Sequence, residues 1–262
     1  MTERSFNGRW RLVALVALAV AVASCGPRQT ILSPNSDQPD LFLWEHGLEA
    51  LEMRRWLDAR TYFQQIVDGY PQSQYRPNAK LGIGDSFMGE DSTESYLLAA
   101  NEFSEFLTLY PTHQRADHAQ YQLAMTHFEQ MRAPERDQTE TAAALAEFDL
   151  FFTNYPDSPL TDEARADWRI ARDRLSEDSY RIGLHYFRIQ WYPGAIDRFR
   201  EVLRDDPEFT YRDQVYYYLA ESLSRTDKTA EAIPYFERLL TEFDSSDRLE
   251  DARERLAELK VQ

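Results

Sequence analysis

Small and aromatic residues recur along the chain at a fixed spacing. An alanine is followed four residues later by a phenylalanine and eight residues after that by a proline, and the pattern occurs four times without a gap. Its members are Ala59, Phe63 and Pro71, then Ala99, Phe103 and Pro111, then Ala144, Phe148 and Pro156, and finally Ala195, Phe199 and Pro207. Residues four apart share a helix face, a small alanine lets helices approach closely, and proline ends a helix. The pattern therefore predicts repeated helices, each packed against a partner.

Each of these helices is expected to follow a first helix with a small residue twelve positions before the alanine. Such residues occur where no insertion intervenes, at Gly47, Gly183 and Ala220. A fifth copy of the pattern has Ala232 and Phe236, with Asp244 in place of the proline. Helix pairs of this kind resemble the tetratricopeptide repeat. We therefore expect an all-α fold, an α-solenoid of about five tetratricopeptide-like helix-turn-helix repeats.

Two of the repeats are longer than the usual period of about 34 residues. Successive prolines lie 40 residues apart in repeat two and 45 in repeat three, where the surplus falls in residues 132–138. The inserted residues are expected to form a loop, either as tolerated filler or as a contact surface. In repeat four, which is the most regular copy, the turn between helices is expected at Tyr192-Pro193-Gly194.

The end of the chain predicts one more helix. Within residues 248–260, one helix face collects the apolar and small side chains Leu249, Ala252, Leu256 and Leu259. A helix with one apolar face that follows the last repeat is expected to cap the solenoid. Pro234 lies about one turn into the preceding helix, where its missing N–H matters only if the helix begins well before it.

The first residues have the layout of an export signal. Three arginines precede an unbroken apolar run over residues 12–23, and small residues follow it. A basic start, a short apolar stretch and small residues are typical of a cleaved secretion signal. The run has 12 residues, whereas crossing a bilayer as a helix takes about 20. A permanent transmembrane helix is therefore disfavoured.

The signal ends in Val22-Ala23-Ser24-Cys25, which resembles the bacterial lipobox. Cys25 is the only cysteine of the chain, so no internal disulfide can form. The resemblance implies that residues 1–24 are a lipoprotein signal peptide and that Cys25 receives acyl chains such as palmitate. The alternative is an ordinary signal peptide with an incidental cysteine. Two or more acyl chains anchor a protein stably. In enterobacterial lipoproteins, an aspartate directly after the cysteine resembles an inner-membrane retention signal. Gly26 occupies that position here, which favours sorting to the outer membrane.

Residues 25–40 are rich in proline and small polar side chains, so we expect a lipidated flexible tether there. Residues 41–262 are then the tetratricopeptide-repeat domain. Removing residues 1–24 takes away three arginines and one glutamate, which lowers the formal net charge from −16 to −18. Such an acidic chain is not expected to bind nucleic acid, because the phosphate backbone would repel it. A solvated acidic surface is the simplest interpretation of this charge.

Motifs of known enzyme classes are absent from the sequence. No HExxH, GxSxG or phosphate-binding glycine loop occurs, and Gly82-Ile83-Gly84 lacks the third glycine of a dinucleotide site. His118 and His127 share a helix face only approximately, and no carboxylate pattern completes a metal site around them. We interpret both histidines as structural or solvated. The sequence therefore predicts a protein that is not an enzyme and needs no cofactor or metal.

The resemblance to tetratricopeptide proteins implies that the first helices line a concave surface. In repeat one the side chains expected there form an apolar stripe of Leu41, Trp44, Leu48 and Leu51, followed by Glu52. The comparable residues are Tyr121, Met125 and Phe128 in repeat three, and Tyr180, Leu184 and Phe187 in repeat four. Such a stripe is more often covered by the chain itself than left open. If it is exposed, it suits an extended peptide with aromatic or aliphatic anchors.

The sequence combines the lipobox and the five repeats with the Tyr110-Pro111-Thr112-His113 junction, the insertion ending near Arg136-Asp137 and the run Tyr155-Pro156-Asp157-Ser158-Pro159. This combination resembles the BamD family. This family comprises lipoproteins of the β-barrel assembly machinery at the periplasmic face of the outer membrane. The resemblance implies that the amino-terminal repeats, including the stripe of repeat one, receive unfolded β-barrel precursors. It also implies that the last repeats dock the periplasmic domain of a BamA-like barrel protein, together with other assembly lipoproteins.

Within that implied docking region, Arg198 matches an arginine that serves the docking in the family, one residue before the repeat phenylalanine. We include Asp197 and Tyr186 beside it as candidate partner-binding residues. The simpler interpretation of Arg198 is a surface arginine paired with Asp197 or Glu201, which would contribute little to stability. The alternative function is a periplasmic tetratricopeptide scaffold for cell-wall or division machinery.

Overall fold

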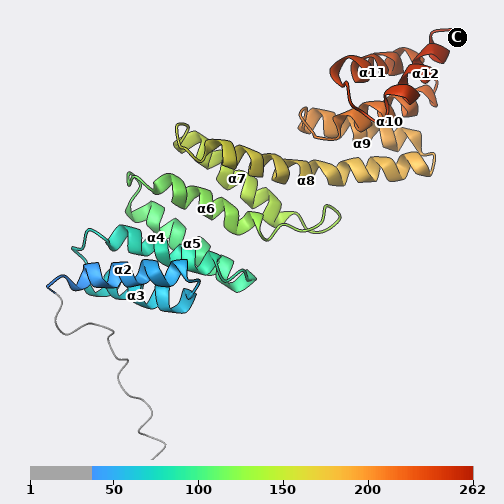
Figure 1. The fold of residues 1–262 in the computed structure, drawn as a ribbon. Helices are drawn as coiled ribbons and strands as arrows, with labels where there is room; N and C mark the ends of the chain where they lie inside the picture. The colour runs from blue at the N-terminus through green and yellow to red at the C-terminus, as the bar shows by residue number, and fades with distance from the viewer. Residues whose placement is uncertain (1–36, 262) are drawn as a thin grey trace, which may run out of the picture.

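The computed structural model describes residues 37–261, and every regular element within that range is an α-helix (Figure 1). In chain order the helices are α2 (Pro39–Glu52), α3 (Trp56–Gly69), α4 (Arg76–Met88), α5 (Thr93–Leu109), α6 (Ala116–Phe128), α7 (Thr139–Asn154), α8 (Thr161–Arg188), α9 (Tyr192–Asp205), α10 (Arg212–Ser224), α11 (Thr229–Glu242) and α12 (Leu249–Leu259). Each helix packs mainly against its neighbours in sequence, so the helices stack into an elongated solenoid. Five pairs followed by α12 confirm the predicted α-solenoid with a C-terminal capping helix.

One phenylalanine from each second helix lies at the centre of its repeat. The five are fully buried, and they are Phe63, Phe103, Phe148, Phe199 and Phe236. Around Phe63 the first helices come very close, since a Cβ atom added to Gly47 of α2 would lie 2.4 Å from its ring and one added to Gly82 of α4 would lie 2.5 Å away. The ring is therefore held between the first helix of its own repeat and that of the next repeat.

The turn inside a repeat has the same backbone conformation in four of the five repeats. Its left-handed residue is Arg54, Asp91, Gln190 or Asp227, with φ between 51° and 61°. Repeat three has no such residue because an insertion replaces the turn. In repeat four the turn lies earlier than the sequence predicted: Tyr192-Pro193-Gly194 form the first turn of α9. A proline fits there because the N–H that it lacks would have no helical partner.

The first and last helices of the described residues are α2 and α12. α2 begins at Pro39, two residues before the start predicted for the repeat domain. The signal peptide, Cys25 and the tether up to residue 36 lie outside the described residues. At the other end, α12 buries Ala252 and Leu259 against the last repeat. Pro234 lies inside α11, which begins five residues earlier at Thr229.

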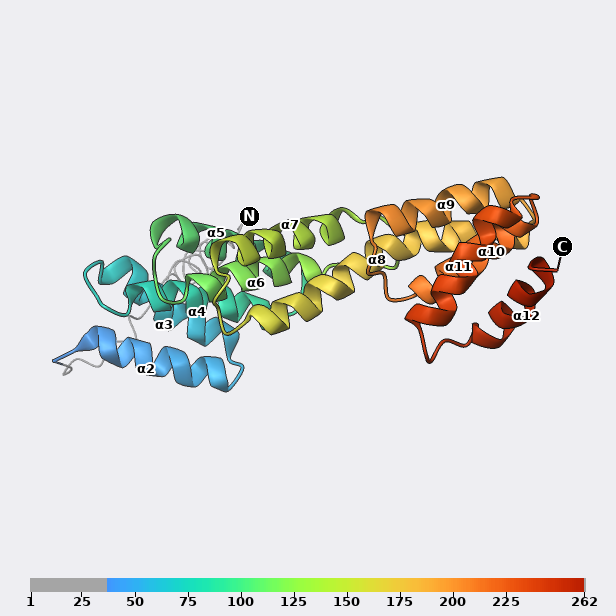
Figure 2. The ribbon, with the colours of Figure 1, turned by 90° about the horizontal axis from the view of Figure 1, so that it is seen from above.

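α8 is the one helix that belongs to two parts of the molecule. It runs without interruption for 28 residues, from Thr161 to Arg188. Its beginning packs against α7 and closes repeat three, whereas its end packs against α9 as the first helix of repeat four. Figure 2 shows α8 joining the block of α2 to α7 to the block of α9 to α12. The sequence predicted a first helix around Gly183, but not its extension back to Thr161.

The middle of α8 is tied to the end of α9 by a buried carboxylate. Asp206 is 3% exposed. Its two carboxylate oxygens accept hydrogen bonds from the Arg169 guanidinium, at 3.0 Å for one of them, and from the Ser176 hydroxyl at 2.7 Å. Burial alone would raise the pKa of Asp206, but the hydrogen bonds from Arg169 and Ser176 outweigh it and hold the pKa below its ordinary value. The ionised carboxylate therefore fixes α9 onto α8.

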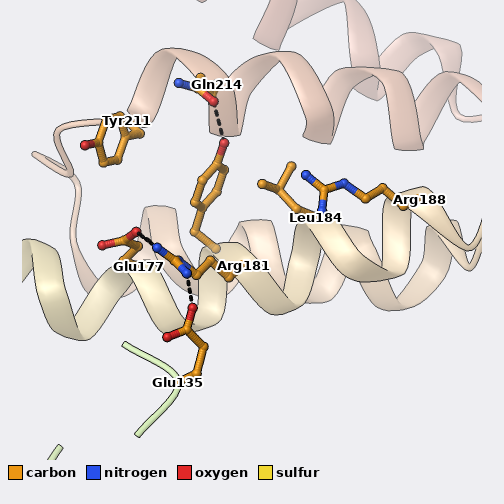
Figure 3. Close-up of a pocket in the computed structure, with 8 residues that line it drawn as sticks. Glu135, Glu177, Arg181, Leu184, Arg188, Tyr211 and Gln214 are labelled. Carbon is orange, nitrogen blue, oxygen red and sulfur yellow. Dashed lines mark hydrogen bonds and ion pairs between the residues drawn. The ribbon is translucent and has the colours of Figure 1, made fainter. Parts of the chain in front are cut away.

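The insertion of repeat three is held against α8. The Gln138 side-chain amide donates hydrogen bonds to the carbonyl oxygens of Ala133 at 2.8 Å and Arg136 at 3.0 Å, which closes the loop on itself. From α8, Arg174 donates to the carbonyl oxygen of Arg132 at 3.2 Å, and Arg181 forms an ion pair with Glu135. The loop is thus packed against α8 of its own chain (Figure 3).

The packing around Phe63 predicts a specific sensitivity to one methyl group. Gly82→Ala should lower the free energy of unfolding by about 1–3 kcal/mol, because the added Cβ has no room beside the ring. Urea unfolding followed by circular dichroism measures this. Gly69→Ala is the matched control, since nothing lies within 4 Å of a Cβ there. Equal unfolding midpoints for the two variants would show that Phe63 can move aside.

The buried carboxylate predicts a pH-dependent difference in stability. Asp206→Asn should lower the free energy of unfolding at pH 7 by about 2–3 kcal/mol, because it removes a charged partner from Arg169. The folded-state pKa of Asp206 is depressed. Its contribution is therefore complete above the unfolded-state pKa of about 3.9 and disappears as the pH falls through the folded-state pKa.

Chemical unfolding of the wild type and Asp206→Asn at pH 7, 5 and 3 tests this. The two proteins should differ at pH 7 and 5 and converge at lower pH. The exposed Asp157→Asn should match the wild type throughout. If the difference in free energy of unfolding between the wild type and Asp206→Asn stayed constant down to pH 3, Asp206 would not be the stabilising ionised carboxylate.

Candidate partner-binding surfaces

Arg198 and Tyr186, two of the candidate docking residues, are brought together by α9 and α8. Both line a hollow of about 530 Å³. The other lining residues are Glu135, Asp178, Arg181, Ile182 and His185. Arg198 donates a hydrogen bond to Glu201 at 2.8 Å, and its side chain stays 38% exposed. An ion pair this exposed is worth about 0.2–1 kcal/mol. Arg198 can therefore exchange Glu201 for a partner's carboxylate at little cost.

The position of Arg198 in its repeat carries a different side chain elsewhere. Three residues after the repeat alanine, repeats two and three have Glu102 and Glu147. Both carboxylates serve the interior: Glu102 accepts a hydrogen bond from the buried Lys80 at 2.9 Å, and Glu147 accepts one from the buried Gln120 at 2.7 Å. Arg198 has no buried partner of this kind. In repeat four the side chain at this position therefore points outward, whereas repeats two and three use it for internal packing.

Trp191 is an exposed aromatic residue beside this hollow that the sequence analysis did not single out. Its ring meets Tyr186 edge-on with centroids 4.5 Å apart, and it also lies against Gly194, where an added Cβ would be 2.6 Å from the indole. Even so, 52% of Trp191 is exposed, and the neighbouring Ile189 is 57% exposed. A large aromatic held in place yet open to solvent is typical of interaction surfaces. The exposure of Trp191 depends on tertiary packing, so the sequence gives no direct signal for it.

Arg198, Tyr186, Trp191 and Ile189 together form what we call the docking surface. It combines one arginine with apolar and aromatic side chains, the residue types enriched where proteins bind one another. Asp197, the third candidate, is exposed on α9 but does not line the hollow. The structure therefore brings together two of the three residues proposed from sequence and adds two more.

The apolar stripe of repeat one is partly covered by its own repeat. Trp44 stacks on Tyr75 at the start of α4, with centroids 5.7 Å apart and rings inclined by 12°, and it also contacts Phe63. Leu51 packs partly against the same core, and Leu41 is half-buried. Leu48 is the most open of the four residues, at 37% exposed. The stripe therefore offers Leu48 and one side of Trp44 to a ligand rather than a continuous apolar surface.

The comparable residues of later repeats are more deeply buried. Tyr121 and Tyr180 are each 6% exposed. Met125, Phe128, Leu184 and Phe187 pack partly against the local cores. Leu48 of repeat one is more exposed than any of these six residues.

Within residues 37–261 the side chains form no cluster of histidine, cysteine and carboxylate groups that could hold a metal ion. His118 lies 3.0 Å from Asp85, and His127 lies 2.8 Å from Glu140. Each histidine thus has one carboxylate partner, in agreement with a structural role. The same part of the chain contains no helix that is both long and apolar enough to cross a membrane.

Solved structures match this chain at low sequence identity. One of them is the TPR2AB-domain:pHSP90-complex of yeast Sti1, which is 11% identical in sequence. It matches with a TM-score of 0.49 over 86% of this chain and 84% of that chain. A family model for the tetratricopeptide repeat matches residues 214–246, which cover α10 and α11.

Curated relatives match over most of their length. A protein of Caulobacter vibrioides named outer membrane protein assembly factor BamD is 28% identical over 222 residues, covering 84% of this chain and 72% of the relative. Proteins of the same name are 25% identical in Vibrio cholerae, covering 66% of this chain and 74% of the relative, and 23% identical in Rickettsia prowazekii, covering 80% and 82%.

The YfiO family model, described as outer membrane lipoprotein, matches residues 36–226. The match begins just before α2 and extends through α10, so it includes the stripe of repeat one and the docking surface. It also spans the insertion of repeat three and the whole of α8. A match over more than half of the chain shows the family. The chain belongs to the YfiO family of outer membrane lipoproteins.

Proposed function

We propose that this chain is a lipid-anchored periplasmic scaffold of the β-barrel assembly machinery, which promotes the folding and insertion of outer-membrane proteins. The observation that carries the proposal is the family match together with curated relatives named assembly factors over most of both chains. The helical repeats are consistent with it, because solenoids present extended binding surfaces. The chemistry of the described residues offers protein-binding surfaces.

The anchor in this proposal is Cys25, acylated after removal of residues 1–24. Pro39, the first residue of α2, lies fourteen positions after Cys25. Because an extended chain spans at most about 3.6 Å per residue, α2 would begin within about 50 Å of the lipid surface. This length holds the solenoid at the periplasmic face of the outer membrane.

The docking surface is our candidate site for the periplasmic domain of a BamA-like barrel protein. Its half-exposed Arg198 would pair with a carboxylate of that domain, and Trp191 with Tyr186 would supply the apolar contact. Asp197, which is exposed on α9 outside the hollow, would contact a cationic side chain of the same domain at the edge of the docking surface. Other assembly lipoproteins are further partners that the family relationship suggests.

The half-open stripe of repeat one is our candidate site for unfolded barrel precursors. Leu48 and the free side of Trp44 would receive aliphatic or aromatic side chains of an extended segment. The stripe lies on α2 and the docking surface at the end of α8 and on α9, so one chain would hold a substrate and the barrel protein at separate places.

Affinity purification of the lipoprotein from detergent-solubilised envelopes tests the docking proposal. The wild type should recover a barrel protein with periplasmic domains. Arg198→Glu should reduce that recovery at least fivefold, because it places like charges in contact. Arg204→Glu makes the same charge change at an exposed position of α9 and should leave recovery intact. Recovery of cell-wall synthases alone would favour the division scaffold and overturn the proposal.

Photo-crosslinking in growing cells tests the substrate proposal. A crosslinking residue at Leu48 should capture unfolded barrel precursors, and one at Trp44 should do so more weakly because part of that side chain is covered. Leu150 of α7 is similarly exposed, at 47%, and lies outside the stripe, so it serves as the control position. Equal capture at Leu48 and Leu150, or capture of the chain's own residues alone, would contradict the assignment.

A further inference from the structure

The most exposed large apolar side chains of residues 37–261 belong to the first two repeats. Apart from Val261 at the end of that range, they are Leu57 at 67%, Leu97 at 63% and Met53 at 59% exposed. Met53 lies in the turn between α2 and α3, and the two leucines lie on α3 and α5, at the amino-terminal end of the solenoid (Figure 1). A single exposed apolar side chain is ordinary, whereas a group of them marks a contact surface.

These side chains lie on one side of the molecule. Leu57 and Leu97 occupy the same position of neighbouring repeats, two residues before the repeat alanine. Equivalent positions of successive repeats face the same side of a solenoid. The turns of the two repeats also meet, because a Cβ atom added to Gly89 at the end of α4 would lie 2.6 Å from the Trp56 ring at the start of α3. The later repeats have smaller residues at this position, namely Ala142, Pro193 and Ala230.

The turn between α2 and α3 combines apolar side chains with two arginines. Its sequence is Met53-Arg54-Arg55-Trp56-Leu57. Both arginines are exposed. Within the described part of the chain, Arg54 forms no ion pair, and Arg55 has a single long one, to Asp58 at 3.7 Å. Aliphatic side chains next to tryptophan and arginine are typical of protein segments that lie in the headgroup region of a bilayer.

The backbone fixes the shape of this turn. The Arg54 N–H donates a hydrogen bond to the carbonyl oxygen of Leu51 at 3.0 Å. The Arg55 N–H donates one to the carbonyl oxygen of Ala50 at 2.8 Å. On the other side of the turn, the half-buried Trp56 packs against the end of α4. The exposed side chains therefore need little further ordering when they bind.

The opposite end of repeat one has a different character, although the chain continues from there to Cys25. Its exposed residues include Asp37, Asp68 and Gln72. Such an end does not suit a lipid surface, because acidic side chains are repelled by anionic headgroups and neither acidic nor amide side chains enter hydrocarbon readily. The turn between α2 and α3 is the end of repeat one that carries apolar side chains and unpaired positive charge.

The proposed anchor leaves this turn within reach of the membrane. α2 has 14 residues, so it is about 21 Å long. If the turn touches the bilayer and α2 stands upright, Pro39 lies about 21 Å from the lipid surface. The chain from Cys25 to Pro39 spans up to about 50 Å, which is more than twice that distance.

We propose that the turn between α2 and α3 contacts the bilayer in addition to the acyl chains. Met53 and Leu57 insert among the lipid headgroups, and Arg54 and Arg55 contact lipid phosphates. The exposed leucine of α5 extends the contact to repeat two. The inference rests on the proposed function, because it requires the lipid anchor. Such a contact would orient the solenoid relative to the membrane, which a flexible tether alone would not do.

Quenching by labelled lipids tests the proposal on the acylated mature lipoprotein in vesicles of phosphatidylethanolamine with a minor share of phosphatidylglycerol. Cys25 is the only cysteine and would be acylated, so Met53→Cys supplies one free thiol for a bimane label. Lipids with a nitroxide on the acyl chain should quench this label about threefold more strongly than a label at Gly69→Cys. Gly69 is exposed at the opposite end of α3, and nothing lies within 4 Å of a Cβ there.

A label at Leu97→Cys should also be quenched, whereas a label at Leu150→Cys should not, because Leu150 is exposed on α7 of repeat three. Strong quenching at both leucine positions would show general proximity to lipid and would overturn the proposal.

The arginines are tested by charge reversal. Arg54→Glu combined with Arg55→Glu should reduce the quenching at position 53 about twofold, because both phosphate contacts are lost. Arg204→Glu combined with Arg253→Glu makes the same charge change at exposed positions of α9 and α12 and should leave the quenching unchanged. Equal reductions for the two pairs would remove Arg54 and Arg55 from the contact.

Equal quenching at positions 53 and 69 would overturn the proposal. A label at position 53 that is shielded from aqueous iodide but not quenched by nitroxide lipids would show that a second copy of the chain covers the turn, which would also overturn it. The mass of the mature chain reports acylation separately. An unacylated chain would refute the anchor and this inference together, whereas an acylated chain without quenching at position 53 would refute this inference alone.

Discussion

The fit of one phenylalanine ring between two first helices is the constraint from which the rest of this solenoid follows. Phe63 fills the space that Gly47 and Gly82 leave open, so repeat one does not complete its core without the first helix of repeat two. Stability of this kind passes from neighbour to neighbour along the chain. Among the described helices, α2 and α12 stand at the two ends of the stack. α12 buries its apolar face, whereas α2 leaves Leu48 and part of Trp44 open.

Local spacing was enough to predict the fold but not the surfaces. The alanine, phenylalanine and proline of each repeat encode a helix, its contact and its end, and all of these act within a few residues. The continuous α8 follows from an absence of helix-breaking residues between Thr161 and Ile182, which is a weaker signal than a repeated motif. Tyr192-Pro193-Gly194 suggested a turn because proline and glycine occur in turns, yet the same residues also suit the first turn of a helix.

The candidate sites were predictable only where a residue departs from the repeat pattern. Arg198 was found through a family resemblance, and the structure adds a physical reason, because the equivalent glutamates serve internal packing. Trp191 could not be identified in this way. Its prominence results from Tyr186 on one side and Gly194 on the other, and no sequence spacing encodes that combination. The insertion of repeat three contributes Glu135 to the lining of the hollow beside the docking surface, where its carboxylate pairs with Arg181.

The unbroken course of α8 also limits how this chain can change in length during evolution. A helix of 28 residues is about 42 Å long, and each residue turns the following segment by about 100°. Deleting a single residue from its middle would swing α9 to α12 around the helix axis and separate Asp206 from Arg169. Only insertions or deletions of about seven or eleven residues would keep α9 to α12 in the same orientation around the α8 axis. Loops between the other helices can lengthen freely, as repeat three shows, whereas α8 tolerates insertions only in whole turns.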